Sequence, residues 1–213
     1  MINISKLYSN KLFLSIEMFI LMVIPLSLIY LYPPIIHARL GVMSAGLFYV
    51  YLVAKLLHIT PSSTGLTTVN FYPAIKSLCL PTSLFIATIL LAYHFVPSTL
   101  ITTAVQQEIA HQGIFFSLLG YLFISAPVQE IVMRTFLIPR LEHVSNNRYF
   151  LIIFTTLIFG TIHIPLNNYW LTISSYLLGI LWAHNFINFR NFFALWLSHA
   201  TIGSIFIYFL GSI

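Results

Sequence analysis

The sequence predicts an all-α, polytopic membrane protein built as a bundle of about seven transmembrane helices. Of its 213 residues, 59% are hydrophobic and only 6% are charged, and the mean hydropathy is +0.96. A soluble domain carries about 25% charged residues, so this chain has too few of them to cover a surface that faces water. A lipid bilayer suits such a composition, and residues 1–213 are expected to form a single integral membrane domain.

Seven apolar stretches are candidate spans, because a helix that crosses the hydrocarbon needs about 20 mainly apolar residues. They cover residues 12–32, 41–57, 79–97, 115–138, 149–164, 169–187 and 192–210. The second and the fifth are short, which allows them to be tilted, extended or partly re-entrant. Turn-forming residues separate the spans at 33–34, 60–68 and 146–147.

The basic residues predict an orientation and exclude nucleic acid as a partner. The net charge is +5, but the positive side chains are scattered rather than clustered. Lysine and arginine favour the cytoplasmic side of a membrane. With a cytoplasmic N-terminus, that side receives Lys6, Lys11, Lys55, Lys76, Arg140, Arg148 and Arg190. Arg39 alone falls on the opposite side and Arg134 lies within a span, so the pattern predicts an N-in, C-out topology.

Glu130 and Arg134 stand out because both lie within the fourth apolar stretch. An ionisable side chain at the bilayer centre costs about 2.5–3.5 kcal/mol on insertion scales, so it indicates a functional site by default. Residues four apart share a helix face and can form an ion pair. An ion pair that only neutralises the two charges and stabilises the helix would explain these residues. It leaves the histidines that follow unexplained.

His163 closes the fifth stretch and His199 lies well inside the seventh. Each histidine alone is more often a hydrogen-bonded core residue, but polar side chains on three apolar helices predict a shared site inside the bundle. A glutamate with a histidine nearby can deprotonate a water for attack on a peptide carbonyl, and a second histidine can stabilise the oxyanion. The chain has no aspartate, which excludes an aspartyl protease, and it contains neither H-E-x-x-H nor G-x-S-G.

At these residues the sequence resembles the CPBP family, the type II CAAX prenyl endopeptidases and their bacterial relatives, often called Abi proteins. That family shows E-E-x-x-x-R, then F-x-x-x-H, then H-x-x-x-N on successive transmembrane helices. Here the three motifs read Gln129-Glu130-x-x-x-Arg134, Phe159-x-x-x-His163 and His199-x-x-x-Gly203. The resemblance covers about residues 115–210, which we expect to form a CPBP-like catalytic core.

Two positions depart from the family pattern. Gln129 stands where the resemblance implies a water-activating glutamate, and an amide cannot act as a base. Gly203 stands where the family has an asparagine that helps to bind the oxyanion. Either Glu130 takes over the base role or catalysis has been lost. Adjacent helical residues point about 100° apart, so a takeover requires a local distortion, which Pro127 can supply.

We therefore expect an intramembrane endopeptidase that cleaves a membrane-associated peptide or protein tail with glutamate- and histidine-activated water. Glu130 is the predicted base, or the partner of the group that activates water, and Arg134 orients it. His163 is expected to hold the water and His199 to stabilise the oxyanion. The resemblance implies a bacterial inner (plasma) membrane as the location.

Several alternatives stay open at this stage. A catalytically inactive family member would bind a membrane peptide or a partner protein, as in an immunity-like role. A proton-coupled transporter is disfavoured because the chain shows no repeated halves. Glu130, His163 and His199 can in principle supply three ligands of a zinc ion, although hydrogen-bonding roles need no metal.

The span ends raise one geometric problem. They place His163 towards the non-cytoplasmic side and Glu130 towards the cytoplasmic side. If the two share a cavity, the fifth helix must be tilted, broken or longer than its apolar stretch.

Overall fold

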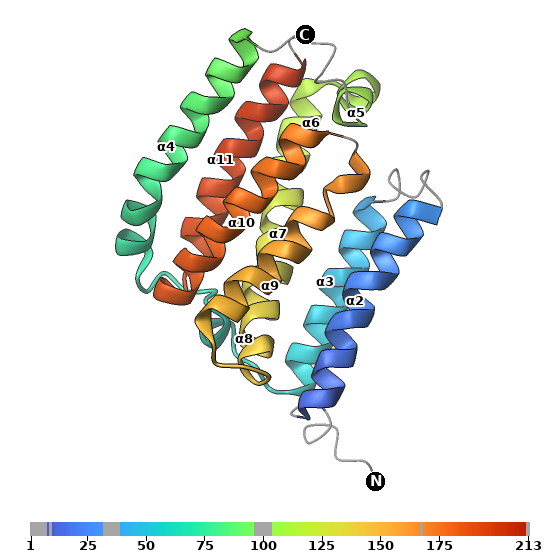
Figure 1. Ribbon diagram of the computed structural model, residues 1–213, viewed down its shortest axis with the longest axis vertical. Coiled ribbons are helices and arrows are strands. Elements are labelled where there is room, and N and C mark those ends of the chain that lie inside the picture. The colour runs from blue at the N-terminus through green and yellow to red at the C-terminus, as the bar shows by residue number, and fades with distance from the viewer. Residues whose placement is uncertain (1–7, 9, 32–38, 96–103, 167, 212–213) are drawn as a thin grey trace.

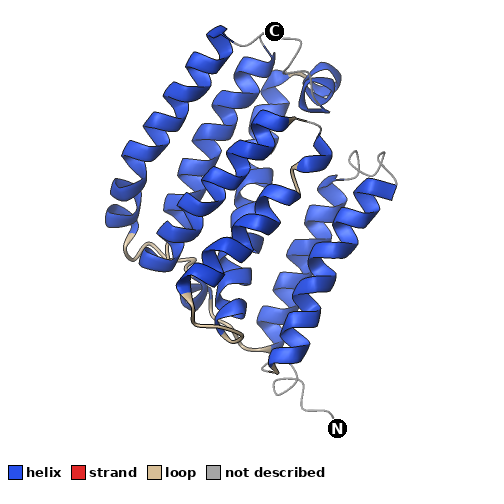
Figure 2. Ribbon diagram, viewed as in Figure 1, coloured by secondary structure: helices blue, strands red, loops and turns tan. Residues whose placement is uncertain are grey.

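The computed structural model describes residues 8, 10–31, 39–95, 104–166 and 168–211, and every regular element among them is helical (Figure 2). The predicted all-α class is confirmed. The long helices are α2 (Lys11–Leu31), α3 (Arg39–Leu56), α4 (Phe71–Phe95), α9 (Arg148–Thr161), α10 (Tyr169–Phe189) and α11 (Phe192–Gly211). A further continuous helical stretch runs from Ile114 to Glu142, and the short α5 (Ala104–Gln112) precedes it. Lys6, His37 and the 33–34 prolines lie outside the described residues.

The long helices run side by side and alternate in direction (Figure 1). In that view α4, α11, α10 and α9 follow one another, α3 and α2 lie at the far side, and the stretch from α6 to α8 runs behind α9 and α10. Close packing joins α9 to α10 and α4 to α11. The bundle therefore places the fourth, fifth, sixth and seventh predicted spans around a common centre.

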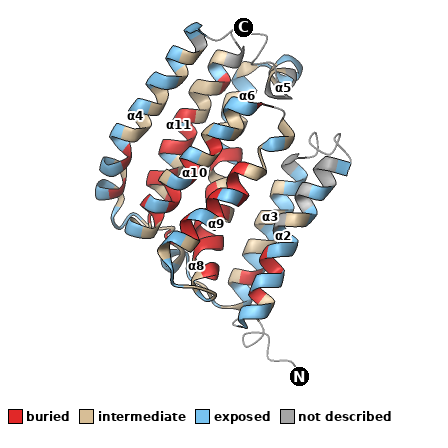
Figure 3. Ribbon diagram, viewed as in Figure 1, coloured by how far each residue is buried: buried red, intermediate tan, exposed pale blue. Residues whose placement is uncertain are grey.

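Four described segments are long and apolar enough to cross a membrane: Phe71–Ala92, Ile114–Glu142, Arg148–Leu166 and Phe192–Phe209. Gly41–Leu56 is apolar but shorter. Many large apolar side chains on the outer helix faces are exposed, as lipid-facing residues are (Figure 3). The chain is an integral membrane protein, while the count of seven spans stays a prediction.

The basic residues gather at one end of the bundle. Lys11 begins α2, Lys55 lies in the last turn of α3, Arg148 begins α9 and Arg190 caps the C-terminus of α10. These helix ends all lie at the lower end in Figure 1, whereas α3 begins with Arg39 at the upper end. The grouping agrees with the predicted topology, and the side of the membrane that this end faces stays a prediction.

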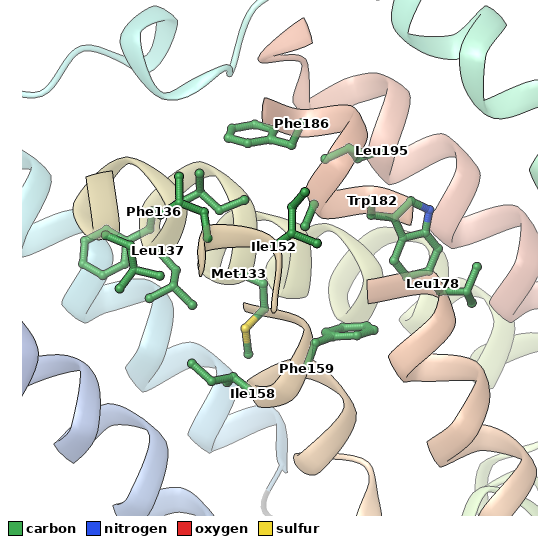
Figure 4. Close-up of a cluster of buried hydrophobic side chains, with 14 of the residues drawn as sticks. Met133, Phe136, Leu137, Ile152, Ile158, Phe159, Leu178, Trp182, Phe186 and Leu195 are labelled. Atoms are coloured by element: carbon green, nitrogen blue, oxygen red, sulfur yellow. The ribbon is translucent and has the colours of Figure 1, made fainter. Parts of the chain in front are cut away.

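The core lies between the helices that follow residue 120, where buried positions concentrate along α8 to α11 (Figure 3). Figure 4 shows part of this core, including Phe159, Trp182 and Phe186, all of which are fully or almost fully buried. Small residues bring α9 and α10 close together. Gly160 contacts the Tyr176 ring, so that a Cβ atom added there would lie 2.2 Å from it.

The stretch from Ile114 to Glu142 alternates between helix types. α6 (Ile114–Gly120), α7 (Ala126–Glu130) and α8 (Leu137–Glu142) are α-helical, and the π-helical η4 (Tyr121–Ser125) and η5 (Ile131–Phe136) separate them. A proline lacks an N–H and clashes with the carbonyl four residues earlier. For Pro127 and Pro139 those carbonyls belong to Phe123 and Thr135, one in each π-helical stretch. Local widening relieves both clashes, so the distortion expected near Pro127 is present on both sides of Glu130.

The fifth predicted span is broken, which solves the depth problem. α9 ends at Thr161, and the chain continues through a turn into the single 3₁₀ turn η6 (Ile164–Leu166). A rise of 1.5 Å per residue places Thr161 about 20 Å from the start of α9 and Glu130 about 18 Å from the end of α8. The loop 143–147 joins these two helix ends. His163 and Glu130 therefore lie at a similar depth, near the middle of the bundle.

Candidate active site

Glu130, Arg134 and His199 form a buried ion cluster. Glu130 Oε1 accepts hydrogen bonds from Arg134 Nη1 at 3.2 Å and from His199 Nδ1 at 2.7 Å. Both Glu130 and Arg134 are 0% exposed, and His199 is 4% exposed. The contact joins α7 to α11 across 69 residues of sequence. Three of the five predicted site residues thus meet in one place.

Aromatic rings fix the orientation of this cluster. The Arg134 guanidinium lies 4.4 Å from the centroid of the Phe159 ring and 5.5 Å from that of Trp182. Trp182 also stacks on His199 with 4.2 Å between ring centroids, and its Nε1 donates to Ser198 Oγ at 3.0 Å. Cations are attracted to ring faces, and the low dielectric of the core strengthens the ion pair. The cluster is therefore held rigidly from both sides.

His163 lies beside this cluster without a direct hydrogen bond to its three members in the described structure. Its Nδ1 bonds to the Phe159 carbonyl at 2.7 Å. A carbonyl can only accept, so Nδ1 carries the proton and Nε2 of the neutral ring carries a lone pair. The centroid of the Phe159 ring lies 4.9 Å from that of the His163 ring and 5.8 Å from that of the His199 ring. His163 is partly exposed, and Nε2 of its neutral ring is a proton acceptor.

Several polar atoms at the centre have no hydrogen-bond partner among the described residues. They are Gln129 Oε1, Glu130 Oε2, Arg134 Nε and Arg134 Nη2, all of them buried. A buried polar atom without a partner costs free energy, and such atoms are rare in folded proteins. The site therefore keeps more bonding capacity than the fold needs.

A tyrosine occupies the space next to Gly203. Gly203 follows His199 by one turn of α11, and a Cβ atom added to it would lie 2.1 Å from the Tyr121 hydroxyl. The Tyr121 ring, at the start of η4, stands edge-on to His199 with 5.9 Å between centroids. Sequence reasoning missed Tyr121. The available signal was Gly203, because its missing side chain leaves a space that another residue can fill.

Comparison with known proteins now identifies the segment that holds the site. Residues 111–205 match the family described as type II CAAX prenyl endopeptidase Rce1-like. The match contains all three motifs and confirms the resemblance seen in the sequence. Neither the comparison with curated proteins nor that with solved structures gives a match. Since the Rce1-like family is a protease family, the match supports a peptidase function within the membrane.

The Rce1-like segment does not offer a metal site at its centre. Among the described residues, no three histidine, cysteine, aspartate or glutamate side chains are placed to hold a metal ion. Glu130 Oε1 and His199 Nδ1 bond to each other, and the Arg134 guanidinium is 3.2 Å from the same oxygen. A zinc ion there would compete with this cation for one carboxylate. The zinc ligand set considered from the sequence therefore does not fit this arrangement of the described side chains.

The other described histidines lie outside the cluster and are exposed: His58, His94, His111, His143 and His184. His163 and His199 are the histidines that share the Phe159 ring. This separation agrees with the sequence argument that selected these two.

A second buried ion cluster ties the Rce1-like segment to the helices before it. Glu17 of α2 accepts hydrogen bonds from Arg140 of α8 and from the Tyr49 hydroxyl of α3. The Arg140 guanidinium lies over the rings of Tyr8 and Phe136, and Arg140 is only 4% exposed. Sequence reasoning placed Arg140 on a cytoplasmic loop and missed this pair. The available signal was Glu17 itself, an acidic residue inside an apolar stretch.

Proposed function

We propose that the protein is an intramembrane endopeptidase that hydrolyses a peptide bond in a membrane-associated peptide or protein tail. The observation that carries this proposal is the Glu130–His199 hydrogen bond at mid-depth of the bundle, with the His163 ring packed against the same Phe159 ring as His199. A pair that merely pinned two helices would need neither a second histidine nor buried polar atoms without partners. The proposal therefore explains features that a structural role leaves unexplained.

His163 is the group that takes the proton from the attacking water. Glu130 is 0% exposed, so water does not reach its carboxylate in this arrangement. His163 is partly exposed and presents a lone pair on Nε2. As the water oxygen attacks the carbonyl carbon, its proton moves to His163 Nε2, which returns it to the amine when the C–N bond breaks.

Glu130 acts through His199, the residue that stabilises the negative charge of the oxyanion. Its carboxylate accepts from His199 Nδ1 and balances the charge of a doubly protonated ring. The second nitrogen of that ring then donates to the oxyanion. Arg134 holds the carboxylate in place from the next turn of the helix. Gln129 contributes a buried amide oxygen, which, unlike a carboxylate, cannot deprotonate a water.

We further propose that the end of the bundle rich in lysine and arginine faces the cytoplasm. The start of α2 and the loop 143–147 lie at that end (Figure 1). A bacterial plasma membrane is the expected location, on the basis of the resemblance to bacterial members of the family.

Mass spectrometry of peptide cleavage tests the proposed function. Purified protein in nanodiscs is incubated with a library of membrane-protein tails in water enriched in ¹⁸O. Wild-type protein should cleave at least one tail and place one ¹⁸O in the new carboxyl group. The His163→Ala variant should lose about 100-fold or more of this activity, whereas His184→Ala, at an exposed histidine, should keep it.

Gln129→Glu separates the proposal from its alternative. An inactive member that binds a peptide or partner protein is favoured by the amide at position 129. Activity that appears only in Gln129→Glu would overturn the proposal and establish such a binding role. Cleavage by the wild-type protein at a rate that Gln129→Glu does not raise supports the His163 mechanism.

A further inference from the structure

The Tyr121 hydroxyl lies in the space where a side chain at position 203 would project. Gly203 has no side chain to fill this space. The hydroxyl and the ring edge of Tyr121 lie within 2.2 Å of the position that an added Cβ atom would take. Positions 199 and 203 are four apart, so they share one face of α11. Tyr121 therefore brings a hydroxyl from another helix to the position one turn beyond His199.

Within the described part of the chain Tyr121 has no hydrogen bond to another residue, although it is close enough to Glu130 to interact electrostatically with it. Tyr121 is partly exposed. A phenolic hydroxyl can always donate one hydrogen bond, and one that is left without a partner in a polar cluster costs stability.

The ring is held in place by the helix that carries it. Tyr121 is the first residue of the π-helical η4, and Trp196 Nε1 of α11 donates to the Leu122 carbonyl at 2.8 Å. This bond satisfies a backbone group in the widened turn, as membrane helices require. It also fixes the register of η4 against α11. The distance between the rings of Tyr121 and His199 is therefore set by two helices that cannot slide independently.

We propose that Tyr121 is a catalytic residue that donates a hydrogen bond to the oxyanion of the substrate, together with His199. This assignment rests on the proposed endopeptidase function. Oxyanion stabilisation needs fixed donors aimed at the point where negative charge develops. His199 supplies one donor, the side chain of residue 203 supplies none, and Tyr121 supplies the second from the space that Gly203 leaves open. The two positions are coupled, because any larger residue at 203 would collide with the Tyr121 ring.

Kinetics of Tyr121→Phe test the assignment. The variant keeps the ring and loses only the hydroxyl, so kcat should fall about 100- to 1,000-fold while KM and the thermal midpoint stay close to the wild-type values. Tyr208→Phe, at a tyrosine that is 56% exposed on α11, serves as the matched control and should behave as wild type. A kcat of Tyr121→Phe equal to that of wild type would overturn the assignment and reduce Tyr121 to a space-filling role.

A donor swap provides the second readout. Tyr121→Ala combined with Gly203→Asn removes the phenol and returns a donor from α11, and it should recover at least tenfold over Tyr121→Ala alone. Tyr121→Ala with Gly203→Leu restores a similar volume without a donor and should recover nothing. Equal recovery in both double variants would overturn the assignment, since volume alone would then explain it. No cleavage by wild-type protein would overturn the endopeptidase function and this assignment together, whereas cleavage with a fully active Tyr121→Phe would overturn only the assignment.

Discussion

Glu17 and Glu130 are both buried glutamates that bind a buried arginine, yet their surroundings differ. Both carboxylate oxygens of Glu17 are bonded, one to Arg140 and the other to the Tyr49 hydroxyl. Glu130 uses only Oε1, which binds Arg134 and His199, and its Oε2 has no partner among the described residues. The first carboxylate is fully used by the fold, and the second keeps one oxygen without a partner among the described residues.

This difference shows how a structural ion pair can be told from a functional one. Burying two charges costs several kcal/mol each, and their attraction offsets this only when further hydrogen bonds complete the cluster. The Glu17 carboxylate meets that condition, and its pair joins α2 and α3 to α8. Within the described residues, two guanidinium nitrogens of Arg134 also lack partners, against one of Arg140. The Glu130 cluster is therefore the less well satisfied of the two, which is expected where bonding capacity is kept for a reaction.

The largest expected effect on stability comes from removing one arginine. Either Arg134→Leu or Arg140→Leu leaves a buried carboxylate without its cation, which should lower the free energy of unfolding by about 3–5 kcal/mol. Thermal unfolding in detergent checks both variants. A loss below about 1 kcal/mol at either site would show that its pair is accessible to water, contrary to the burial seen here.

Replacing both partners should separate the two clusters. Glu17→Met with Arg140→Leu removes both charges and fills their volume, so stability should stay unchanged or rise by about 1–4 kcal/mol with cleavage intact. Glu130→Met with Arg134→Leu should be equally stable and completely inactive. The readouts are the unfolding midpoint and the cleavage rate per folded molecule. Cleavage by the second double variant would contradict a catalytic role for Glu130.

Trp196→Phe should have a moderate effect on both properties. The change removes the hydrogen bond to the Leu122 carbonyl and leaves a partly buried acceptor in η4, which should cost about 1 kcal/mol. Because this bond holds η4 against α11, the cleavage rate should also fall. Thermal unfolding and kcat measure the two effects, and a variant with wild-type kcat would show that the register of η4 does not depend on this bond.

The smallest effect is expected at the Glu142–Arg190 pair near the basic end of the bundle. These side chains are 30% and 35% exposed, so solvent screens them and their pair should contribute about 0–1 kcal/mol. Glu142→Gln should leave the unfolding midpoint and the cleavage rate nearly unchanged. It serves as a control for the cost of losing a glutamate as such. A loss as large as that of Arg140→Leu would show that exposure does not decide the strength of these pairs.

Much of the fold and part of the site could be predicted from the sequence. Long apolar stretches fix where helices lie in a membrane. Only the third predicted span, 79–97, starts several residues after the beginning of its helix, α4 (Phe71–Phe95). The reason is that Lys76 interrupts the apolar pattern of α4. The Glu130–Arg134 pair was visible because four-residue spacing is local. The contact with His199 was a reasonable expectation, since few polar residues occupy these helices.

The rest depends on contacts that spacing does not encode. Arg140 near the end of a span looks like an interfacial residue, and only its contact with Glu17, 123 positions away, buries it. Tyr121 fills the space beside Gly203 because of how η4 packs on α11, which no periodicity indicates. The short polar α5 carried no apolar pattern to predict it.

The most direct test of the central claim compares Glu130→Gln with Glu17→Gln on the same peptide. Each variant keeps the size of the side chain and removes one buried negative charge, so both should be less stable than wild type. We predict that the cleavage rate per folded molecule falls by about 100-fold or more for Glu130→Gln and stays within about twofold of wild type for Glu17→Gln. Equal rates in the two variants would contradict the claim that Glu130, and not Glu17, belongs to a catalytic centre.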